Sequence, residues 1–501
     1  MLTDDGVVAW VGSDQAAATM GADVIVELAD AWVAPAFVDA HVHATSTGLA
    51  LTGLDLTDAP SLAVALSRVE QAARRAHGGA VLGTGWDDTC WPERRAPTAA
   101  ELDRASYGGV VYLARTDVHS AVASSALLAA VPQARDEPGF LPEGLVRQQA
   151  HHVVRRAAYA AVSRGQREAA QLAMLDRAAS LGIACVHECG GPDIAGEQDF
   201  LDLLALDHGV QVVGYWGELD GIERARALGA AGAGGDLFAD GALGSHTACL
   251  SAPYEDADTS GHAYLDSDEV ARHVIACTNA SLQAGFHAIG DAALTEVVAG
   301  YAAAAQVVGT SELRARRHRI EHAEMLGPEL TAQLAALGLV ASVQPAFDAR
   351  WGGPTGMYAE RLGARRAAPM NPFAALAAAG VALAFGSDAP VTPLDPWGAL
   401  RAAVHHRTPG SGLSARAAFA AHTRGGWRAA GNDGAGELTP GRPATFAVWE
   451  VPGELAVQMP DERVAGWSTD PRSAVAGLPD LAGPDPLCRR TVVAGVTVYE
   501  Q

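Results

Sequence analysis

The feature that most constrains the fold of this chain is a long alternation of short apolar runs with alanine-rich segments. The runs are rich in β-branched and aromatic residues, whereas the segments between them space their apolar residues as an amphipathic helix does. Strands that alternate with helices favour a parallel sheet, and eight of them favour an α/β fold of the (β/α)8, TIM-like barrel type. The runs that we interpret as the eight barrel strands are residues 36–43, 109–116, 184–190, 235–241, 285–291, 318–324, 339–345 and 381–388.

Both ends of the chain follow a different pattern, in which short strands are separated by turn residues. We expect residues 1–33 and 436–501 to form one composite β-sandwich domain, and residues 34–435 to form the barrel. The barrel part exceeds the roughly 250 residues of a usual barrel, so we predict an insert after the first strand, at about residues 50–170. The terminal strands that we predict are residues 6–12, 23–29, 444–450 and 490–500.

The charge balance excludes some classes of partner. With 35 basic and 58 acidic residues, the net charge is −23. Such a chain repels nucleic acid and anionic membranes, whereas a neutral or cationic small-molecule substrate is compatible. Six cysteines are too few for a disulfide scaffold, and no apolar run reaches about 18 residues. We therefore expect a cytoplasmic protein and leave a homodimer open.

Histidines and acids stand at the carboxyl ends of these runs. His41 and His43 end the first run, and His287, His322 and Asp388 end later ones. The strands of a barrel all point their carboxyl ends to one mouth, so these side chains should converge. Residues two apart in a strand face the same way, so both imidazoles of the first run can face one ion. Imidazoles with a carboxylate suit Zn²⁺ or a similar cation, which lowers the pKa of a bound water from about 15.7 to about 7.

Other histidines have simpler interpretations. A single histidine at a strand end is more often hydrogen-bonded scaffolding, so only the joint pattern predicts a metal site. His187 lies between Cys185 and Cys189, where a Cys–His metal site is an alternative, but such thiols are more typical of small buried side chains. His151 and His152 are interpreted as the solvated start of a helix.

Several longer motifs extend this pattern over nearly the whole chain. They are AFVDAHVHATSTGL (36–49), GWDDTCWPERRAPTAAELD (85–103), LFADGALGSHTACLSAPY (237–254), FHAIGDAAL (286–294), RIEHAEML (319–326), VQPAF (343–347), GSDAPVTPLDPW (386–397) and LTPGRPATFAVWE (438–450). The first resembles the opening motif of the amidohydrolase superfamily. Together they resemble the YtcJ-like amidohydrolases, a group that includes N-substituted formamide deformylases.

The resemblance implies a set of metal residues and a proton carrier. In the superfamily the histidine pair, a strand-five histidine and the strand-eight aspartate hold a metal, and this aspartate also manages the proton. The strand-six histidine binds a second metal or assists catalysis. The residues of this chain at those positions are His41, His43, His287, His322 and Asp388.

The resemblance also implies pocket residues. RTDVHSAVASSALL, at residues 115–128, resembles a family stretch in which Arg115, Asp117 and His119 would shape the pocket or contact the substrate, although Val118 replaces the usual glycine. Trp86 and Asp87 resemble pocket residues from the insert.

One departure from the family bears on the number of metal ions. Relatives commonly have a lysine at the position of Asp236, and in two-metal members a carboxylated lysine bridges both ions. This chain contains no lysine at all. The shorter side chain of Asp236 would need a shifted strand or an added water to span the gap, so we expect one divalent ion, Zn²⁺. Two ions bridged by Asp236 or Glu188 are the alternative.

The sequence therefore predicts a metal-dependent hydrolase that cleaves a non-peptide C–N bond, such as the amide of an N-substituted formamide. Asp388 would take and return the proton, and His322 or His119 would stabilise the oxyanion. A deaminase or cyclic-amide hydrolase is an alternative, suggested by Glu324 in the motif HAE, although we expect Glu324 to form a salt bridge at a helix start. A catalytically silent ligand-binding barrel is a further alternative.

Overall fold

The structure is a computed structural model that describes residues 1–501 except 29, 77, 454 and 457–476. Eight parallel strands form a sheet of order β16-β15-β14-β13-β12-β11-β10-β4. A parallel bridge between Val42 and Ala389 joins its two edges, so the sheet closes into the predicted barrel. The strands are β4 (Phe37–Val42), β10 (Ile183–Gly190), β11 (Gln211–Trp216), β12 (Gly232–Ala233), β13 (Gln283–Ala288), β14 (Arg319–His322), β15 (Val340–Val343) and β16 (Ala382–Phe385).

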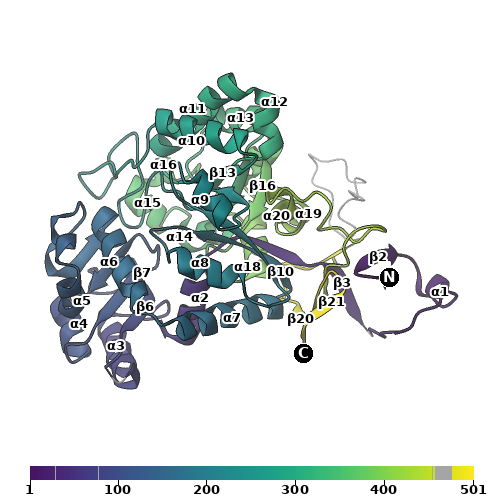
Figure 1. Ribbon diagram of the computed structural model, residues 1–501, viewed down its shortest axis with the longest axis horizontal. Coiled ribbons are helices and arrows are strands. Elements are labelled where there is room, and N and C mark those ends of the chain that lie inside the picture. Colours follow the sequence, from purple (N-terminus) through teal and green to yellow (C-terminus); the bar gives the residue numbers. More distant parts are fainter. Residues whose placement is uncertain (29, 77, 454, 457–476) are drawn as a thin grey trace.

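Helices cover the outside of this barrel (Figure 1). They bury alanine, leucine and valine side chains against the strands, in one core cluster that includes Phe286 and Tyr301. Among the described residues, none of the helices combines the length and the apolar character needed to cross a bilayer. The main covering helices are α2 (Ala44–Thr52), α7 (Arg164–Ser180), α8 (Glu197–Leu204), α9 (Ile222–Ala227), α10 (Ser267–Asn279), α11 (Asp291–Val308), α13 (Pro328–Leu337), α17 (Phe373–Ala378), α18 (Pro396–Val404) and α20 (Arg424–Ala429).

Two of the predicted barrel strands were wrong. The run at 109–116 forms β7 (Val111–Arg115), which belongs to a separate five-stranded sheet. This strand is packed on both faces by helices of the insert, so its sequence looks like that of a barrel strand. The true third strand, β11, was missed because its first residues are not buried and its apolar run is short. The fourth strand, β12, is only two residues long and ends before the predicted run at 235–241.

The insert occupies Leu54–Ala160 and lies against one side of the barrel (Figure 1). Its sheet has the order β5-β6-β7-β8-β9, partly parallel and partly antiparallel. Its remaining elements are β5 (Leu54–Asp55), α3 (Leu62–Ala76), β6 (Val81–Trp86), α4 (Ala99–Ala105), β8 (Ser120–Ala123), α5 (Ser125–Ala130), β9 (Leu145–Arg147) and α6 (Gln148–Ala160).

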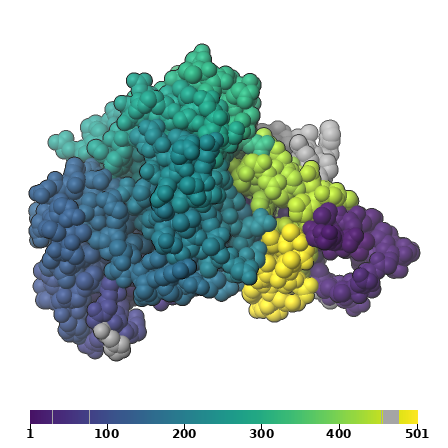
Figure 2. All heavy atoms as spheres, viewed as in Figure 1, coloured from purple at the N-terminus to yellow at the C-terminus, as the bar shows by residue number. Residues whose placement is uncertain are grey.

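Both chain ends contribute antiparallel sheets on the opposite side of the molecule, where purple and yellow atoms lie side by side (Figure 2). The larger sheet has the order β21-β20-β17-β3, and β1 pairs with β2. The expected strand at 23–29 was wrong for its described part, residues 23–28, whose apolar side chains are exposed and unpaired with any strand; residue 29 lies outside the described residues. The strands are β1 (Leu2–Asp4), β2 (Val7–Trp10), β3 (Ala31–Pro35), β17 (Phe446–Glu450), β20 (Leu487–Val493) and β21 (Val496–Glu500).

Aromatic rings join the terminal sheet to the bottom of the barrel. The ring of Phe37, at the start of β4, lies 5.2 Å from that of Trp397 and 5.7 Å from that of Trp449 on β17. The strand β3 spans the domain boundary that we predicted between residues 33 and 34, and β4 begins only two residues after β3 ends. Our division of the chain into domains stays a proposal.

Candidate metal centre

The paired histidines of β4 open the site at the mouth of the barrel. His41 lies in β4, and His43 occupies the N-cap position of α2. Both rings therefore come from the same short segment of the chain. The Nε2 atom of His41 lies 3.4 Å from Asp236 Oδ1, and that of His43 lies 3.2 Å from Asp236 Oδ2. Both rings are buried, with exposures of 0% and 6%. The pair therefore faces one carboxylate.

Asp236 also reaches the other pair of histidines. Its Oδ1 atom lies 3.5 Å from Nδ1 of His287 and 3.7 Å from Nε2 of His322. The short strand β12 ends at Ala233, and Gly234 and Gly235 lead from it to Asp236. A side chain at Gly234 would lie 2.2 Å from the backbone of Gly285, so only glycine permits this path.

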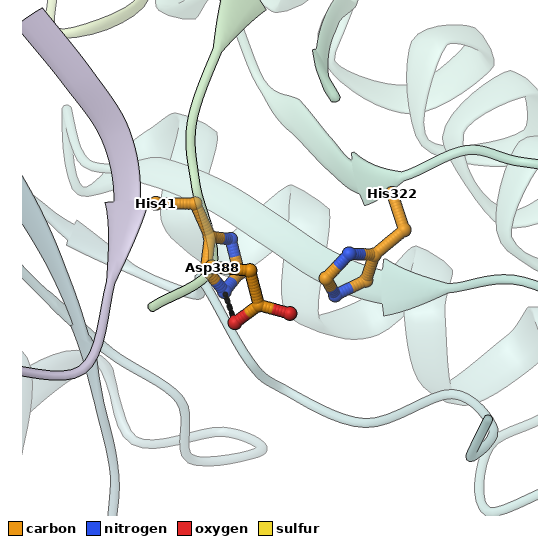
Figure 3. Close-up of side chains that lie close together, drawn as sticks. All are labelled: His41, His322 and Asp388. Atoms are coloured by element: carbon orange, nitrogen blue, oxygen red, sulfur yellow. Dashed lines mark ion pairs between the residues drawn. The ribbon is translucent and has the colours of Figure 1, made fainter. Parts of the chain in front are cut away.

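Asp388 completes the group from the turn that follows β16. Its Oδ1 atom lies 3.1 Å from Nε2 of His43 and 3.5 Å from Nε2 of His41, and Figure 3 shows its carboxylate beside the His41 ring. Asp388 and His322 both have left-handed backbones, with φ of 53° and 69°. This conformation costs a non-glycine residue about 1–2 kcal/mol. Such strain is typical of functional sites.

The polar atoms of this group fit a divalent cation. Several inward-facing atoms are buried without a hydrogen-bond partner in the described part of the chain. Two ligands held tetrahedrally at about 2.0–2.2 Å from a zinc ion lie about 3.4 Å apart. The nitrogen–oxygen distances given above, 3.1–3.7 Å, bracket this value. The unpartnered atoms are His41 Nε2, Asp236 Oδ1, His287 Nδ1, His322 Nε2 and Asp388 Oδ1.

An outer layer orients three of the rings, and the sequence analysis missed it. His41 Nδ1 lies 2.9 Å from Glu321 Oε2, and His322 Nδ1 lies 2.8 Å from Gln344 Oε1. His287 instead uses Nε2, which lies 3.2 Å from the carbonyl oxygen of Gly241. If each of these outer nitrogens donates its proton, the other nitrogen of the same ring keeps a free lone pair on the side of Asp236. A histidine that binds a metal ion needs such a free lone pair.

Arg319 holds the outer carboxylate in place. Its Nε and a terminal nitrogen donate to the two oxygens of Glu321 at 2.8 and 2.9 Å, and both side chains are fully buried. Although burial raises the pKa of Glu321, Arg319 and His41 lower it to about 2. The alternation of Arg319 and Glu321 in the motif RIEH could have signalled this pair, because residues two apart share a face.

The two inner carboxylates give the site a negative potential. Burial lowers the pKa of His43, but the neighbouring carboxylates of Asp236 and Asp388 raise it overall to about 9. Burial conversely raises the pKa of Asp236, but the histidines hold it well below its usual range. The protein therefore favours positive charge at this point.

His119 comes from the insert and not from a barrel strand. It follows β7 in a turn where Val118 has a φ of 50°, a left-handed conformation that a glycine would adopt without strain. The His119 ring lies 4.9 Å from that of His287. Burial, with His287 beside it, lowers the pKa of His119 well below its usual value.

Two cavities flank this centre and share His119, His287, His322 and Asp388. The smaller, of about 350 Å³, is walled by aromatic and aliphatic side chains. They come largely from α14 (Pro345–Trp351) and α15 (Met357–Leu362). The larger, of about 510 Å³, reaches under the insert.

The four residues expected to bind substrate form one buried group. Arg115 pairs with Asp87 at 2.9 Å and with Asp117 at 2.7 Å. Trp86 donates from its ring nitrogen to the carbonyl oxygen of Leu113. Asp117 lines the smaller cavity and accepts the backbone N–H of His119 at 3.1 Å. The structure thus places Asp117 at the cavity and the other three behind it.

Two acidic residues make contacts other than those considered from the sequence, which were a bridge between two ions for Glu188 and a salt bridge for Glu324. Glu188 accepts the backbone N–H of Ala44 at 2.7 Å, so it caps α2. Glu324 was expected to form a salt bridge, and this was wrong: it is 3% exposed, lines the smaller cavity, and its Oε2 atom has no partner among the described residues. Burial raises its pKa to about 7.

The cysteines beside His187 behave as buried apolar side chains. Cys185 and Cys189 have no exposed surface. Burial raises the pKa of the Cys189 thiol to about 12, so it stays protonated and is a poor ligand. His187 accepts a hydrogen bond from Arg319 at 2.9 Å.

Comparison with known proteins gives a consistent result. A model of the Amidohydrolase family matches residues 24–499. The protein LONG AFTER FAR-RED 3 of Arabidopsis thaliana is 29% identical over 465 residues, which are 83% of this chain and 77% of that protein. The putative amidohydrolase YtcJ of Bacillus subtilis (strain 168) is 26% identical over 436 residues, covering 80% and 79%.

Two solved structures share the fold over most of their length. An uncharacterized metal-dependent hydrolase from Pyrococcus furiosus is 25% identical, with a TM-score of 0.64, and the match covers 83% of this chain and 87% of that one. Another from Pyrococcus horikoshii OT3 is 24% identical, with a TM-score of 0.67 and coverage of 84% and 86%.

Proposed function

Because this chain belongs to the amidohydrolase family, we propose that this hydrolase is metal-dependent and cleaves a non-peptide C–N bond, such as the amide of an N-substituted formamide. One observation carries the proposal. Four imidazoles and two carboxylates from distant parts of the chain converge, and their inward-facing atoms are buried without hydrogen-bond partners.

We assign the metal ligands to two groups that share Asp236. The first group has four side chains, His41, His43, Asp236 and Asp388, whereas the second adds only His287 and His322 to the shared carboxylate. More protein ligands give tighter binding, so one Zn²⁺ ion at the first group is favoured and a second binds more weakly. A bound cation supplies Lewis acidity and a water of lowered pKa.

The remaining steps fall to side chains around the cavities. Asp388 lines both cavities, so its carboxylate can take a proton from the attacking water and return it to the leaving nitrogen. His119 is neutral because burial lowers its pKa, so it can donate a hydrogen bond to the substrate carbonyl oxygen. The Nδ1 atom of His322 is engaged by Gln344, which favours a ligand role for its Nε2 atom. We therefore assign the oxyanion contact to His119.

The test combines metal analysis with a substrate panel. The purified protein should contain divalent metal by elemental analysis and should hydrolyse at least one member of a panel of N-formyl and N-acyl amines. His41→Ala should lose turnover; a barrel that only binds a ligand would keep its affinity in this variant. A protein that stays inactive on the whole panel after Zn²⁺ or Mn²⁺ addition would contradict the proposal.

Glu324 favours a second candidate, a deaminase or a cyclic-amide hydrolase. Its buried carboxyl lines the smaller cavity two residues after His322, and a carboxyl there can carry protons to a ring nitrogen. Ammonia release from aminopyrimidines or aminotriazines, lost in Glu324→Gln, would favour a deaminase. Ring opening of a cyclic amide without ammonia would favour the hydrolase.

A further inference from the structure

Arg155 is a buried cation beside the metal centre. It projects from the middle of α6, the helix that closes the insert, and is only 8% exposed. It lines the larger cavity together with His43, Asp236 and Asp388. Any molecule that fills this cavity therefore lies between the Arg155 side chain and the proposed metal ligands.

The guanidinium of Arg155 has no carboxylate partner within the described part of the chain. Its Nε atom is buried without a hydrogen bond, and one terminal nitrogen lies 3.3 Å from Nδ1 of His152. The other deeply buried arginines near the site differ. Arg115 pairs with Asp87 and Asp117, and Arg319 pairs with Glu321. Burying an unpaired charge is expensive, so an unpaired arginine calls for an anion that is not part of the chain.

The histidines and tyrosines near Arg155 carry no negative charge, and the carboxylates of Asp236 and Asp388 in the same cavity pair with His43. His151 and His152 are only 2% and 6% exposed, so our interpretation of a solvated helix start was wrong, because the barrel and the insert cover this helix. Burial, with Arg155 nearby, lowers the pKa of His152 to about 3 and that of His151 well below its usual value. Burial likewise raises the pKa of Tyr112 and Tyr159. All four are therefore neutral near pH 7.

Resting on the proposed function, we propose that Arg155 binds a carboxylate of the substrate. The planar fork of a guanidinium matches a carboxylate through two parallel hydrogen bonds. The smaller cavity, which shares His287 and His322 with the larger one, is walled by Phe347, Trp351 and Tyr358. The substrate class is thus an amide that joins an apolar, preferably aromatic, group to a group that carries a carboxylate. The negative surface, which suggested a neutral or cationic substrate, does not decide the charge of this inner pocket.

The test uses ligands that cannot be hydrolysed. In 4-oxo-4-phenylbutanoate a ketone replaces the amide and the carboxylate lies on the side of the leaving amine. In 4-oxo-5-phenylpentanoate the carboxylate lies on the acyl side. In the neutral partner of each acid, a hydroxymethyl group replaces the carboxylate. Binding to the metal-loaded protein is measured by calorimetry, so the readout does not depend on turnover.

We expect the wild type to bind at least one acid about 10- to 100-fold more tightly than its neutral partner, and Arg155→Met to lose this preference. Arg155→Lys, which keeps the charge but not the fork, should keep part of it. Arg156→Met is the matched control, because Arg156 is the next residue of α6 and pairs with Asp193 at the surface. Without ligand, Arg155→Met should melt at or above the wild-type temperature, since it removes an unpaired buried charge.

Three results would overturn the inference. They are equal binding of the acid and its neutral partner by the wild type, equal preference in Arg155→Met and Arg156→Met, and an Arg155-dependent response to inorganic phosphate but to neither acid. The proposed function fails separately. Arg155-dependent acid binding without hydrolysis of any amide would refute the function alone, whereas hydrolysis of amides together with an acid preference that Arg155→Met leaves unchanged would refute this inference alone.

Discussion

At the scale of single residues, Asp236 occupies the place where the resemblance to two-metal amidohydrolases predicts a carboxylated lysine. Its two oxygens contact His41, His43, His287 and His322. We propose that the unmodified side chain of Asp236 supplies the carboxyl that a lysine would gain by modification. The physical requirement is a carboxylate at this point, and not a particular residue.

The outer carboxylate should control metal affinity. Glu321→Gln removes the charge that fixes the His41 ring through Nδ1, so we expect the metal dissociation constant to rise about 10- to 100-fold. Competition with a chromogenic chelator measures it. Glu223→Gln, on an exposed helix, is the control. Equal affinity in both variants would show that Glu321 does not support the site.

Metal uptake should release protons. In the metal-free protein the pKa of His43 is raised to about 9, so this ring is protonated at pH 7, whereas a ligand ring must be neutral. Affinity should therefore rise as the pH increases toward 9 and fall as the pH decreases. Calorimetry at pH 7 in buffers of different ionisation enthalpy should show about one proton or more released per ion. A heat of binding that is the same in every buffer would contradict this.

At the scale of secondary structure elements, the barrel could be predicted because each strand–helix unit carries its own local pattern. The sequence could not distinguish β7 from a barrel strand, because the insert buries both faces of β7 as a barrel would. The missing signal is which sheet a strand joins, and this depends on pairing over long distances.

The same limit applies to the site. His41, His43, His287, His322 and Asp388 were found because residue type and strand end coincide. Arg155 was not found, because an arginine in an amphipathic helix is usually solvated, and its burial follows only from the packing of α6 against the barrel.

The backbone segment that carries Asp236 should be sensitive to a methyl group added to the residue packed against it. A side chain at Gly217 would lie 2.8 Å from the backbone carbonyl of Asp236. We expect Gly217→Ala to displace this segment and to weaken metal binding by about tenfold or more, since ligand geometry tolerates little displacement. Circular dichroism should show an intact fold.

Gly165→Ala, on α7, is the matched control, because a side chain there meets no atom within 4 Å. Wild-type metal affinity in Gly217→Ala would mean that the close approach at Gly217 does not position Asp236.

At the scale of the whole molecule, the site is assembled from two units. The barrel supplies the six proposed metal ligands, whereas the insert supplies His119, Asp117 and Arg155 from above. The terminal sheets lie on the far side (Figure 1) and contribute none of these nine residues. Preference for a substrate carboxylate should therefore follow the insert, whereas preference for the apolar group and metal binding should follow the barrel.

The central claim is that Asp236 holds a metal ion together with His41, His43 and Asp388. Anomalous diffraction from a crystal of the Zn²⁺-loaded protein, recorded on both sides of the zinc absorption edge, tests it most directly. We expect the strongest zinc-specific peak about 2.0–2.2 Å from Asp236, His41 and His43, with Asp388 in the same shell. A weaker peak between Asp236, His287 and His322 would mark the second ion. A strongest peak at any other place, or the absence of a peak next to Asp236 at saturating zinc, would contradict the account.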